Sequence, residues 1–174
     1  MGHTLEQFTS QCHQFLKNNP GPAGRQQVAN LLKDVLLDKE FIEKYLHANV
    51  GEREIIYEDP ELGFCVVAHN YPGAKNSTPH DHAHSWAIYG QARGETEMCD
   101  YELIEAATAE RAPDQLRILR TQGDLAALLA DRAKGARVVE PTGKALSRRS
   151  SGTRRASAAS AFGPLSVSRA QPSD

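Results

Sequence analysis

Three histidines at alternate positions, His80, His82 and His84, are the residues of this sequence best suited to chemistry. Alternate residues of a β-strand share one face, and neighbours in such a row lie about 6.6 to 6.8 Å apart. Two of these imidazoles can therefore bind one metal ion, but three cannot. Imidazole suits iron, nickel, copper and zinc. The pattern predicts a metal site with at most two ligands from this strand, and a polar surface segment is the alternative interpretation.

The sequence around this row has the pattern of β-strands. A run of β-branched and aromatic residues at 63–69 has the length of a strand, and a loop rich in Pro, Gly, Asn and Ser follows at 71–79. The histidines open a predicted hairpin with its turn at 90–94. We expect a mainly β region after residue 51, with strands at 54–57, 63–69, 80–89, 95–104, 115–119 and 135–139.

The first 50 residues have the pattern of helices. Thr4 followed by Gln7 is a capping-box signature, and apolar residues then recur at helical spacing until Asn18. Pro22 suits a first helical turn and is followed by an apolar stripe. Asp38 is a suitable N-cap for a short further helix. We expect two or three helices that pack on the β region.

Residues 79–101, with the sequence PHDHAHSWAIYGQARGETEMCDY, resemble the first conserved motif of the cupin superfamily, in particular that of the bacterial cysteine dioxygenase-like family. The resemblance covers about residues 5–105. It implies a cupin-type double-stranded β-helix, a mainly β jelly-roll barrel, preceded by two or three α-helices. It also implies that His80 and His82 hold Fe(II), or another divalent transition metal. The implied activity is that of an oxidoreductase that adds O2 to a small thiol and gives a sulfinate.

Three further positions bear on this resemblance. Trp86 stands where most cupins have a metal-binding glutamate, which is typical of thiol dioxygenases with a three-histidine site. Ala87 lies near the position of the crosslinking cysteine of mammalian cysteine dioxygenases, so no crosslink is expected. Arg53 lies about as far ahead of the histidines as the arginine that pairs with the substrate carboxylate in that family, and it is our candidate substrate-binding residue. A surface ion pair with Glu52 or Glu54 is the alternative.

The sequence departs from the family at the third histidine. The family carries it on a later strand, and the best counterpart here, Ala126, cannot bind a metal. All seven histidines lie at or before His84. The alternative to an enzyme is therefore a catalytically inactive cupin-like protein with an incomplete metal site. If a third ligand exists, the candidates are solvent, His69, Glu95, Glu97 and Glu102.

The two parts of the chain differ in composition. The 174 residues carry a net charge of -2, but residues 1–110 hold 8 basic and 17 acidic residues, whereas residues 111–174 hold 12 basic and 5 acidic ones. A shifted reading frame or sequence drift after about residue 110 would account for this change. We expect a helical segment at 1–50, a barrel at 51–146 whose closing strands after residue 110 are not defined, and a disordered Ser/Ala/Arg-rich tail at 147–174.

Several classes of protein are disfavoured by composition. No apolar run reaches the roughly 18 residues of a membrane helix, and the N-terminus lacks the pattern of a signal peptide. Cys12, Cys65 and Cys99 are an odd number at wide spacing, which favours reduced thiols over disulfides. We expect a cytoplasmic protein that binds a small molecule. The arginines of the tail would suit nucleic acid or anionic lipid, but a solvated tail is the preferred interpretation.

Overall fold

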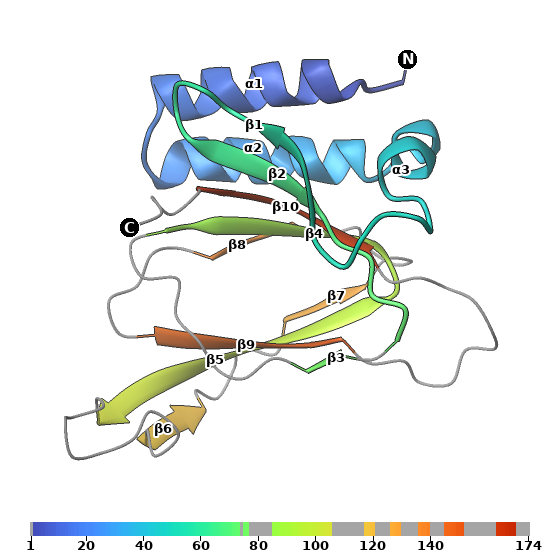
Figure 1. The fold of residues 1–174 in the computed structure, drawn as a ribbon. Helices are drawn as coiled ribbons and strands as arrows, with labels where there is room; N and C mark the ends of the chain where they lie inside the picture. The colour runs from blue at the N-terminus through green and yellow to red at the C-terminus, as the bar shows by residue number, and fades with distance from the viewer. Residues whose placement is uncertain are drawn as a thin grey trace.

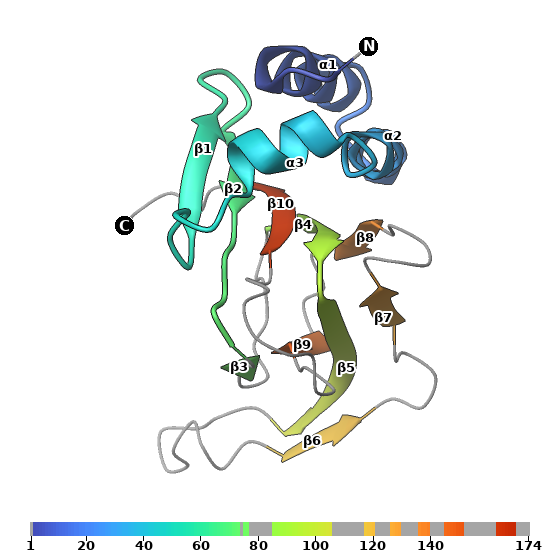
Figure 2. The same ribbon diagram turned by 90° about the vertical axis from the view of Figure 1, so that its right-hand side faces the viewer.

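The computed structural model describes residues 2–73, 75–76, 85–105, 117–120, 126–129, 136–139, 145–151 and 163–169. These ranges contain three helices and ten strands. The elements form layers: the helices cover one face of a first sheet, and a second sheet lies beyond its other face (Figure 1). Figure 2 shows the same layers after a quarter turn. The predicted class, a mainly β protein with N-terminal helices, is confirmed.

The helices begin at the caps that the sequence predicts. The Thr4 hydroxyl accepts a hydrogen bond from the Gln7 amide at 3.1 Å, and the Gln7 side chain accepts one from the Thr4 amide at 3.0 Å. The Asp38 carboxylate accepts hydrogen bonds from two amides in the first turn of the last helix. Such contacts satisfy amides that have no partner within the helix. The helices are α1 (Leu5–Asn18), α2 (Pro22–Val35) and α3 (Lys39–Tyr45).

The first sheet lies under the helices. Its strands are β1 (Glu54–Glu58), β2 (Phe64–Ala68), β4 (Ala87–Arg93), β8 (Ala136–Val139) and β10 (Gly163–Arg169). They occur in the order β1-β2-β10-β4-β8, and all the pairs are antiparallel. The central strand, β10, therefore comes from the end of the chain and joins two strands from its middle.

The second sheet is built from the other strands. These are β3 (Lys75–Asn76), β5 (Glu95–Glu105), β6 (Arg117–Arg120), β7 (Ala126–Leu129) and β9 (Ala145–Ser151). Their order is β3-β9-β5-β6, and β7 also pairs with β5. Strands from before and after residue 110 thus alternate in the order β3-β9-β5-β6 of the second sheet, and in the first sheet they alternate from β2 to β8.

The strand pairs follow one nested pattern. β2 pairs with β10, β3 with β9, β4 with β8 and β5 with β7, always antiparallel. The second half of the β region therefore runs back along the first half, like one long hairpin folded into two sheets. This is the arrangement of a double-stranded β-helix, or jelly roll. The pairing of the strands confirms the predicted topology.

The predicted hairpin at 80–104 is wrong. β4 and β5 lie in different sheets, and the described pairings do not join them. Gly94 alone separates them, with a φ of 72° that favours glycine. Gly90, which we expected in the turn, lies inside β4. Glycine was misleading here because it also occurs in strands where another element approaches closely.

Gly90 is a point of close contact between α2 and the first sheet. A Cβ atom on this residue would lie 2.5 Å from Leu36 Cδ1 and 2.8 Å from Leu32 Cδ2. Both leucines are fully buried in the core between the helices and the sheet. The strand residues in the same core are Phe64, Val66, Ala68, Ile88, Ala92, Leu165 and Val167.

The end of the chain differs from its prediction as a disordered tail. Residues 163–169 form β10, in which Leu165 and Val167 have no exposed surface. The composition of the tail as a whole does not indicate this strand. A short alternation of apolar residues with serine is enough to form a strand when a neighbouring strand pairs with it on each side. Strands β6 to β9 also follow residue 110, so this part of the chain contributes to both sheets.

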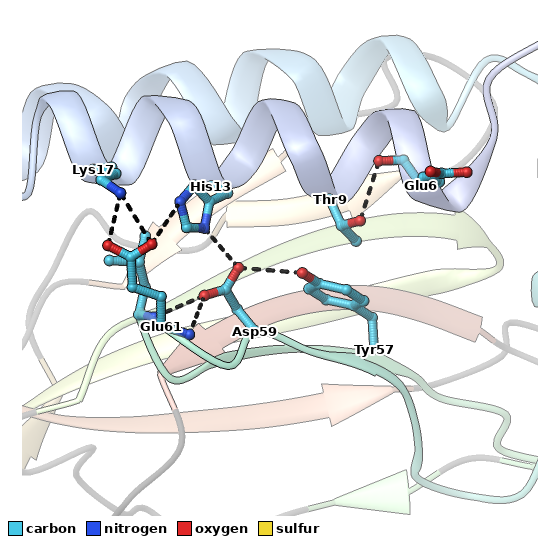
Figure 3. Close-up of polar contacts among 8 residues, drawn as sticks. Glu6, Thr9, His13, Lys17, Tyr57, Asp59 and Glu61 are labelled. Carbon is cyan, nitrogen blue, oxygen red and sulfur yellow. Dashed lines mark hydrogen bonds and ion pairs between the residues drawn. The ribbon is translucent and has the colours of Figure 1, made fainter.

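A buried carboxylate joins α1 to the turn between β1 and β2 (Figure 3). Asp59 is 2% exposed and accepts hydrogen bonds from the amides of Glu61 and Leu62 and, at 3.2 Å, from the Tyr57 hydroxyl. Its Oδ2 atom also lies 2.8 Å from Nδ1 of His13 on α1. Burial alone would raise the pKa of Asp59, but these hydrogen bonds together hold that pKa below its ordinary value. The carboxylate therefore fixes α1 against this end of the first sheet.

We predict that Gly90→Ala lowers the free energy of unfolding by roughly 1–3 kcal/mol. The added methyl group would overlap the buried Leu32 and Leu36, so α2 must shift away from the sheet. Urea denaturation measures the effect. Gly51→Ala is the control, because no atom lies within 4 Å of a Cβ there. Equal stability of the two variants would contradict the close packing of α2 on β4.

A second prediction concerns acid stability. The pKa of Asp59 is lower in the folded protein than in the unfolded chain, where it is about 3.9. Ionised Asp59 therefore stabilises the fold above that pH, and this contribution is lost as the pH falls through the folded-state pKa. Asp59→Asn should lower the free energy of unfolding by about 1–3 kcal/mol at pH 7, and by less at pH 3.

Urea denaturation of the wild type and the variant at both pH values checks this prediction. Glu61→Gln is the control, because Glu61 pairs with Lys17 at 2.7 Å on the exposed side of the same turn. This control should differ little from the wild type. The proposed contribution of Asp59 would be ruled out if the wild type and Asp59→Asn differed more in free energy of unfolding at pH 3 than at pH 7.

Candidate site on the inner face of the first sheet

The first sheet has two faces of different composition. Residues of β2, β4 and β10 alternate between them, and directly paired residues share a face. One face is apolar and packs on the helices. The opposite face, which we call the inner face, lies on the side of the second sheet (Figure 1). Its residues include Cys65, Val67, His69, Ala87, Tyr89, Gln91, Ser166 and Ser168.

Several polar side chains of the inner face are buried. Gln91 is 0% exposed, Ser166 is 3% exposed, and His69 and Tyr89 are each 6% exposed. Buried polar groups are costly unless they form hydrogen bonds. Binding sites for small molecules typically combine apolar side chains with a few such polar groups. The inner face is therefore the candidate functional surface of this barrel.

His69 lies between two hydroxyl groups at the end of β2. Its Nε2 atom is 3.0 Å from Ser166 Oγ, and its Nδ1 atom is 3.2 Å from the Tyr71 hydroxyl. A hydroxyl can donate or accept, so a neutral imidazole satisfies both contacts. These contacts fix the plane of the ring. His69 would have to give up one hydroxyl to bind a metal ion as the third ligand.

Two other contacts occur on or beside the inner face. The side-chain amide of Gln91 donates a hydrogen bond to the Arg93 carbonyl at 2.6 Å. At the other end of β2, Cys65 Sγ lies 3.5 Å from Ser168 Oγ. The inner face thus has a histidine and glutamine at one end and a thiol with a serine at the other.

The predicted metal ligands are not placed by the structure. His80, His82 and His84 lie outside the described residues, in the connection between β3 and β4. Among the residues that are described, no three His, Cys, Asp or Glu side chains gather in a way that could hold a metal ion. The metal site is therefore still a prediction.

The other predicted site residues lie apart from one another. Arg53 is exposed at a bend just before β1, which is an edge strand of the first sheet. Ala126 is the first residue of β7 and pairs with Met98. The carboxylate candidates all lie on β5, in the second sheet: Glu95, Glu97 and Glu102.

Sequence reasoning missed the partners of His69. Composition predicts a disordered tail around Ser166, and the loop predicted at 71–79 gives no role to Tyr71. The alternation Leu165, Ser166, Val167, Ser168 is a period-2 signal that could have identified β10. The pairing of His69 with Ser166 had no such signal, because 97 positions separate them.

No protein-family model matches this chain, and no curated protein matches it. Solved structures with a similar fold share little sequence with it. A protein from Bacillus halodurans is 14% identical over 76% of this chain and 80% of its own, with a TM-score of 0.46. A Klebsiella pneumoniae protein with a double-stranded β-helix domain is 15% identical over 74% of this chain and 80% of its own, with a TM-score of 0.40. The Cnp3 cupin domain from Schizosaccharomyces pombe is 7% identical over 68% and 64%, also with a TM-score of 0.40.

The assignment of a jelly-roll fold rests on the strand pairing and not on these structural similarities. Within the described part of the chain, no helix combines the length and the apolar character that a membrane span requires. Cys12 and Cys65 are both buried free thiols.

We predict that Ser166→Ala lowers the free energy of unfolding by about 1–3 kcal/mol, because His69 loses a hydrogen-bond partner in a buried position. Ser168→Ala is the matched control. It lies on the same strand and face, but its hydroxyl has only a long contact with a thiol. Thermal unfolding of both variants measures the difference. A larger loss in the control would contradict the role assigned to the contact between Ser166 and His69.

Proposed function

We propose that this protein is a cupin metalloprotein that binds a small molecule in its barrel and oxidises a small thiol with O2 to a sulfinate. The observation that carries the proposal is the buried polar surface on the inner face of the first sheet. A jelly roll that needed its inner face only for packing would carry apolar residues there, as it does on the helix side. The thiol and the sulfinate rest on the resemblance of residues 79–101 to thiol dioxygenases.

The proposed metal ligands are His80 and His82. Two imidazoles one residue apart suit Fe(II), or another divalent transition metal, and they leave positions open for other ligands. The sequence places them between β3 and β4, so the same connection leads into the inner-face residues Ala87 and Tyr89. When bound, the ion supplies a redox-active Lewis acid for oxygen chemistry.

The described residues would bind and orient the substrate. Ser166 and Tyr71 hold the ring of His69 in one plane, so that its orientation is fixed before a ligand binds. Gln91 has its amide held by the Arg93 carbonyl. Side chains that are already held in place lose little entropy when a ligand binds. A cytoplasmic location, where thiols stay reduced, would suit both the substrate and the free cysteines.

A second candidate is a cupin-like protein without catalysis. Ala126 occupies β7 in place of the family's third histidine, and the chain has no histidine after His84. Two imidazoles alone would hold a metal ion weakly. The protein would then bind a small molecule on its inner face, or would have lost its function.

Metal analysis of the purified protein tests the proposal. After anaerobic reconstitution with Fe(II) and removal of excess metal, we expect about one iron per chain in the wild type and none in the double variant His80→Ala, His82→Ala. His47→Ala removes an exposed histidine and is the control. Iron-loaded wild type should then consume O2 when a small thiol is added. Wild type that retains no metal would contradict the proposal and favour the second candidate.

A further inference from the structure

His69 joins two hydroxyl groups through different nitrogens of its ring. Its Nε2 atom lies 3.0 Å from Ser166 Oγ on β10, and its Nδ1 atom lies 3.2 Å from the Tyr71 hydroxyl. The ring centroids of His69 and Tyr71 are 5.9 Å apart. We call these three residues, Tyr71, His69 and Ser166, the His69 cluster. It is a continuous series of polar contacts that begins at the end of β2 and ends on β10.

The order of these contacts is that of an activated nucleophile. A serine hydroxyl attacks weakly unless a neighbouring base takes its proton, and that base is itself held by a third group. With its proton on Nδ1, His69 donates to the Tyr71 oxygen, and the lone pair of Nε2 faces the Ser166 hydroxyl. The distance between Ser166 and His69 lies within the range of about 2.6–3.2 Å that suits such a proton transfer. Ser166 can therefore lose its proton to His69 while its oxygen attacks.

The surroundings of Ser166 favour a neutral reaction partner. Ser166 is 3% exposed and His69 is 6% exposed, so little water competes with a bound molecule. The inner-face residues named above include no Asp, Glu, Lys or Arg. A charged ligand that left water for such a surface would lack compensation. Tyr89, which pairs directly with Ser166 on β4, is a further hydroxyl donor on this face.

The His69 cluster adjoins the protein surface at Tyr71. Tyr71 is half-buried, and Pro72 and Gly73, which follow it, are exposed. The cluster thus extends from a buried hydroxyl to a side chain that solvent reaches. This position suits a small reactant better than a polymer.

Ser168 offers a comparison within the same strand. It lies on the same face as Ser166, but its Oγ atom is 3.5 Å from the thiol of Cys65. A thiol is only a weak acceptor, whereas an imidazole nitrogen readily takes a proton. We therefore expect two serines of different reactivity, two residues apart on β10.

We infer that Ser166 is a nucleophile, with His69 as its general base, and that it accepts the acyl group of a small neutral ester. Ser166 Oγ forms a bond to the carbonyl carbon of the ester while its proton passes to Nε2 of His69. The bond between that carbon and the alcohol oxygen then breaks, and the leaving alcohol takes the proton. Water releases the acyl group from Ser166 as a carboxylic acid, with His69 again as the base.

Tyr71 has a positioning role in this reaction, because it contacts His69 and not the reacting atoms. The reaction is a hydrolysis without net oxidation, and it uses none of the proposed metal ligands. The inference therefore goes beyond the proposed function and can be tested on iron-free protein.

Covalent labelling with phenylmethanesulfonyl fluoride tests the nucleophile directly. Ser166 Oγ would displace fluoride from the sulfur atom, and its proton would pass to His69. Peptide mass spectrometry of iron-free wild type should locate one sulfonyl group on Ser166. Labelling should be roughly 100-fold or more faster in the folded protein than in the same protein unfolded in urea, where the serine has no fixed base.

Three variants assign the roles within the cluster. His69→Gln should abolish the labelling of Ser166, and Ser168→Ala, the matched control, should retain it. Tyr71→Phe should lower the maximal rate of labelling by roughly tenfold without changing the reagent concentration that gives half of this rate. A loss of structure alone would not produce that separation. Far-UV circular dichroism and melting temperature verify that each variant is folded.

The ester is tested with 4-nitrophenyl acetate. Iron-free wild type should release 4-nitrophenol, and prior labelling of Ser166 should stop the release. Wild type in which Ser166 is unlabelled, is labelled no faster when folded than when unfolded, or releases no 4-nitrophenol overturns the inference. Labelled Ser166 in protein that cannot retain iron would support this inference while the proposed metal chemistry fails, and iron retention with an inert Ser166 would do the reverse.

Discussion

Strand β10 forms hydrogen-bonded pairs with β2 along one edge and with β4 along the other, and this double pairing decides which side chains share a face. Because the register is fixed on both sides, a shift of one residue would move Leu165 and Val167 out of the core and put serines against the helices. The register of β10 therefore determines both the apolar face toward the helices and the polar inner face.

The helical layer depends on this constraint in turn. α2 packs on the apolar face where β4 has a glycine instead of a side chain. α1 lies further out and is tied to the same sheet through His13 and the buried Asp59 in the turn after β1. With one face of the first sheet covered in this way, the inner face is the one that is left for binding. Its hydroxyl, imidazole and amide groups are already held by neighbours from β2, β4 and β10.

Structural features that depend on residues close together in the chain could be predicted from the sequence. Helix caps at Thr4 and Asp38 were predictable, because the hydrogen bonds involve residues two or three positions away. The position of β8 was also predictable from a short β-branched run. Gly90 was not, because its role depends on a helix more than 50 residues earlier in the chain. β10 was missed because its stability comes from two neighbouring strands, and composition alone does not show them.

The candidate site shows the same limit. The alternate histidines of residues 80–84 could be read as a metal motif from spacing alone, whereas the link between His69 and Ser166 exists only after the jelly roll has formed. Arg53, the arginine favoured by sequence position, is exposed beside β1, the edge strand of the first sheet. A motif within one segment can be proposed from the sequence, whereas a contact between distant strands such as that of His69 with Ser166 needs the fold.

We propose that a small molecule and the metal ion share the inner face of the first sheet. Paramagnetic NMR of protein loaded with Co(II) tests it most directly, because resonances close to the ion are shifted and broadened. The side-chain resonances of His69, Tyr89 and Gln91 should be affected, and that of His13, on the helix side, should not. Broadening at His13 with an undisturbed inner face would contradict the claim.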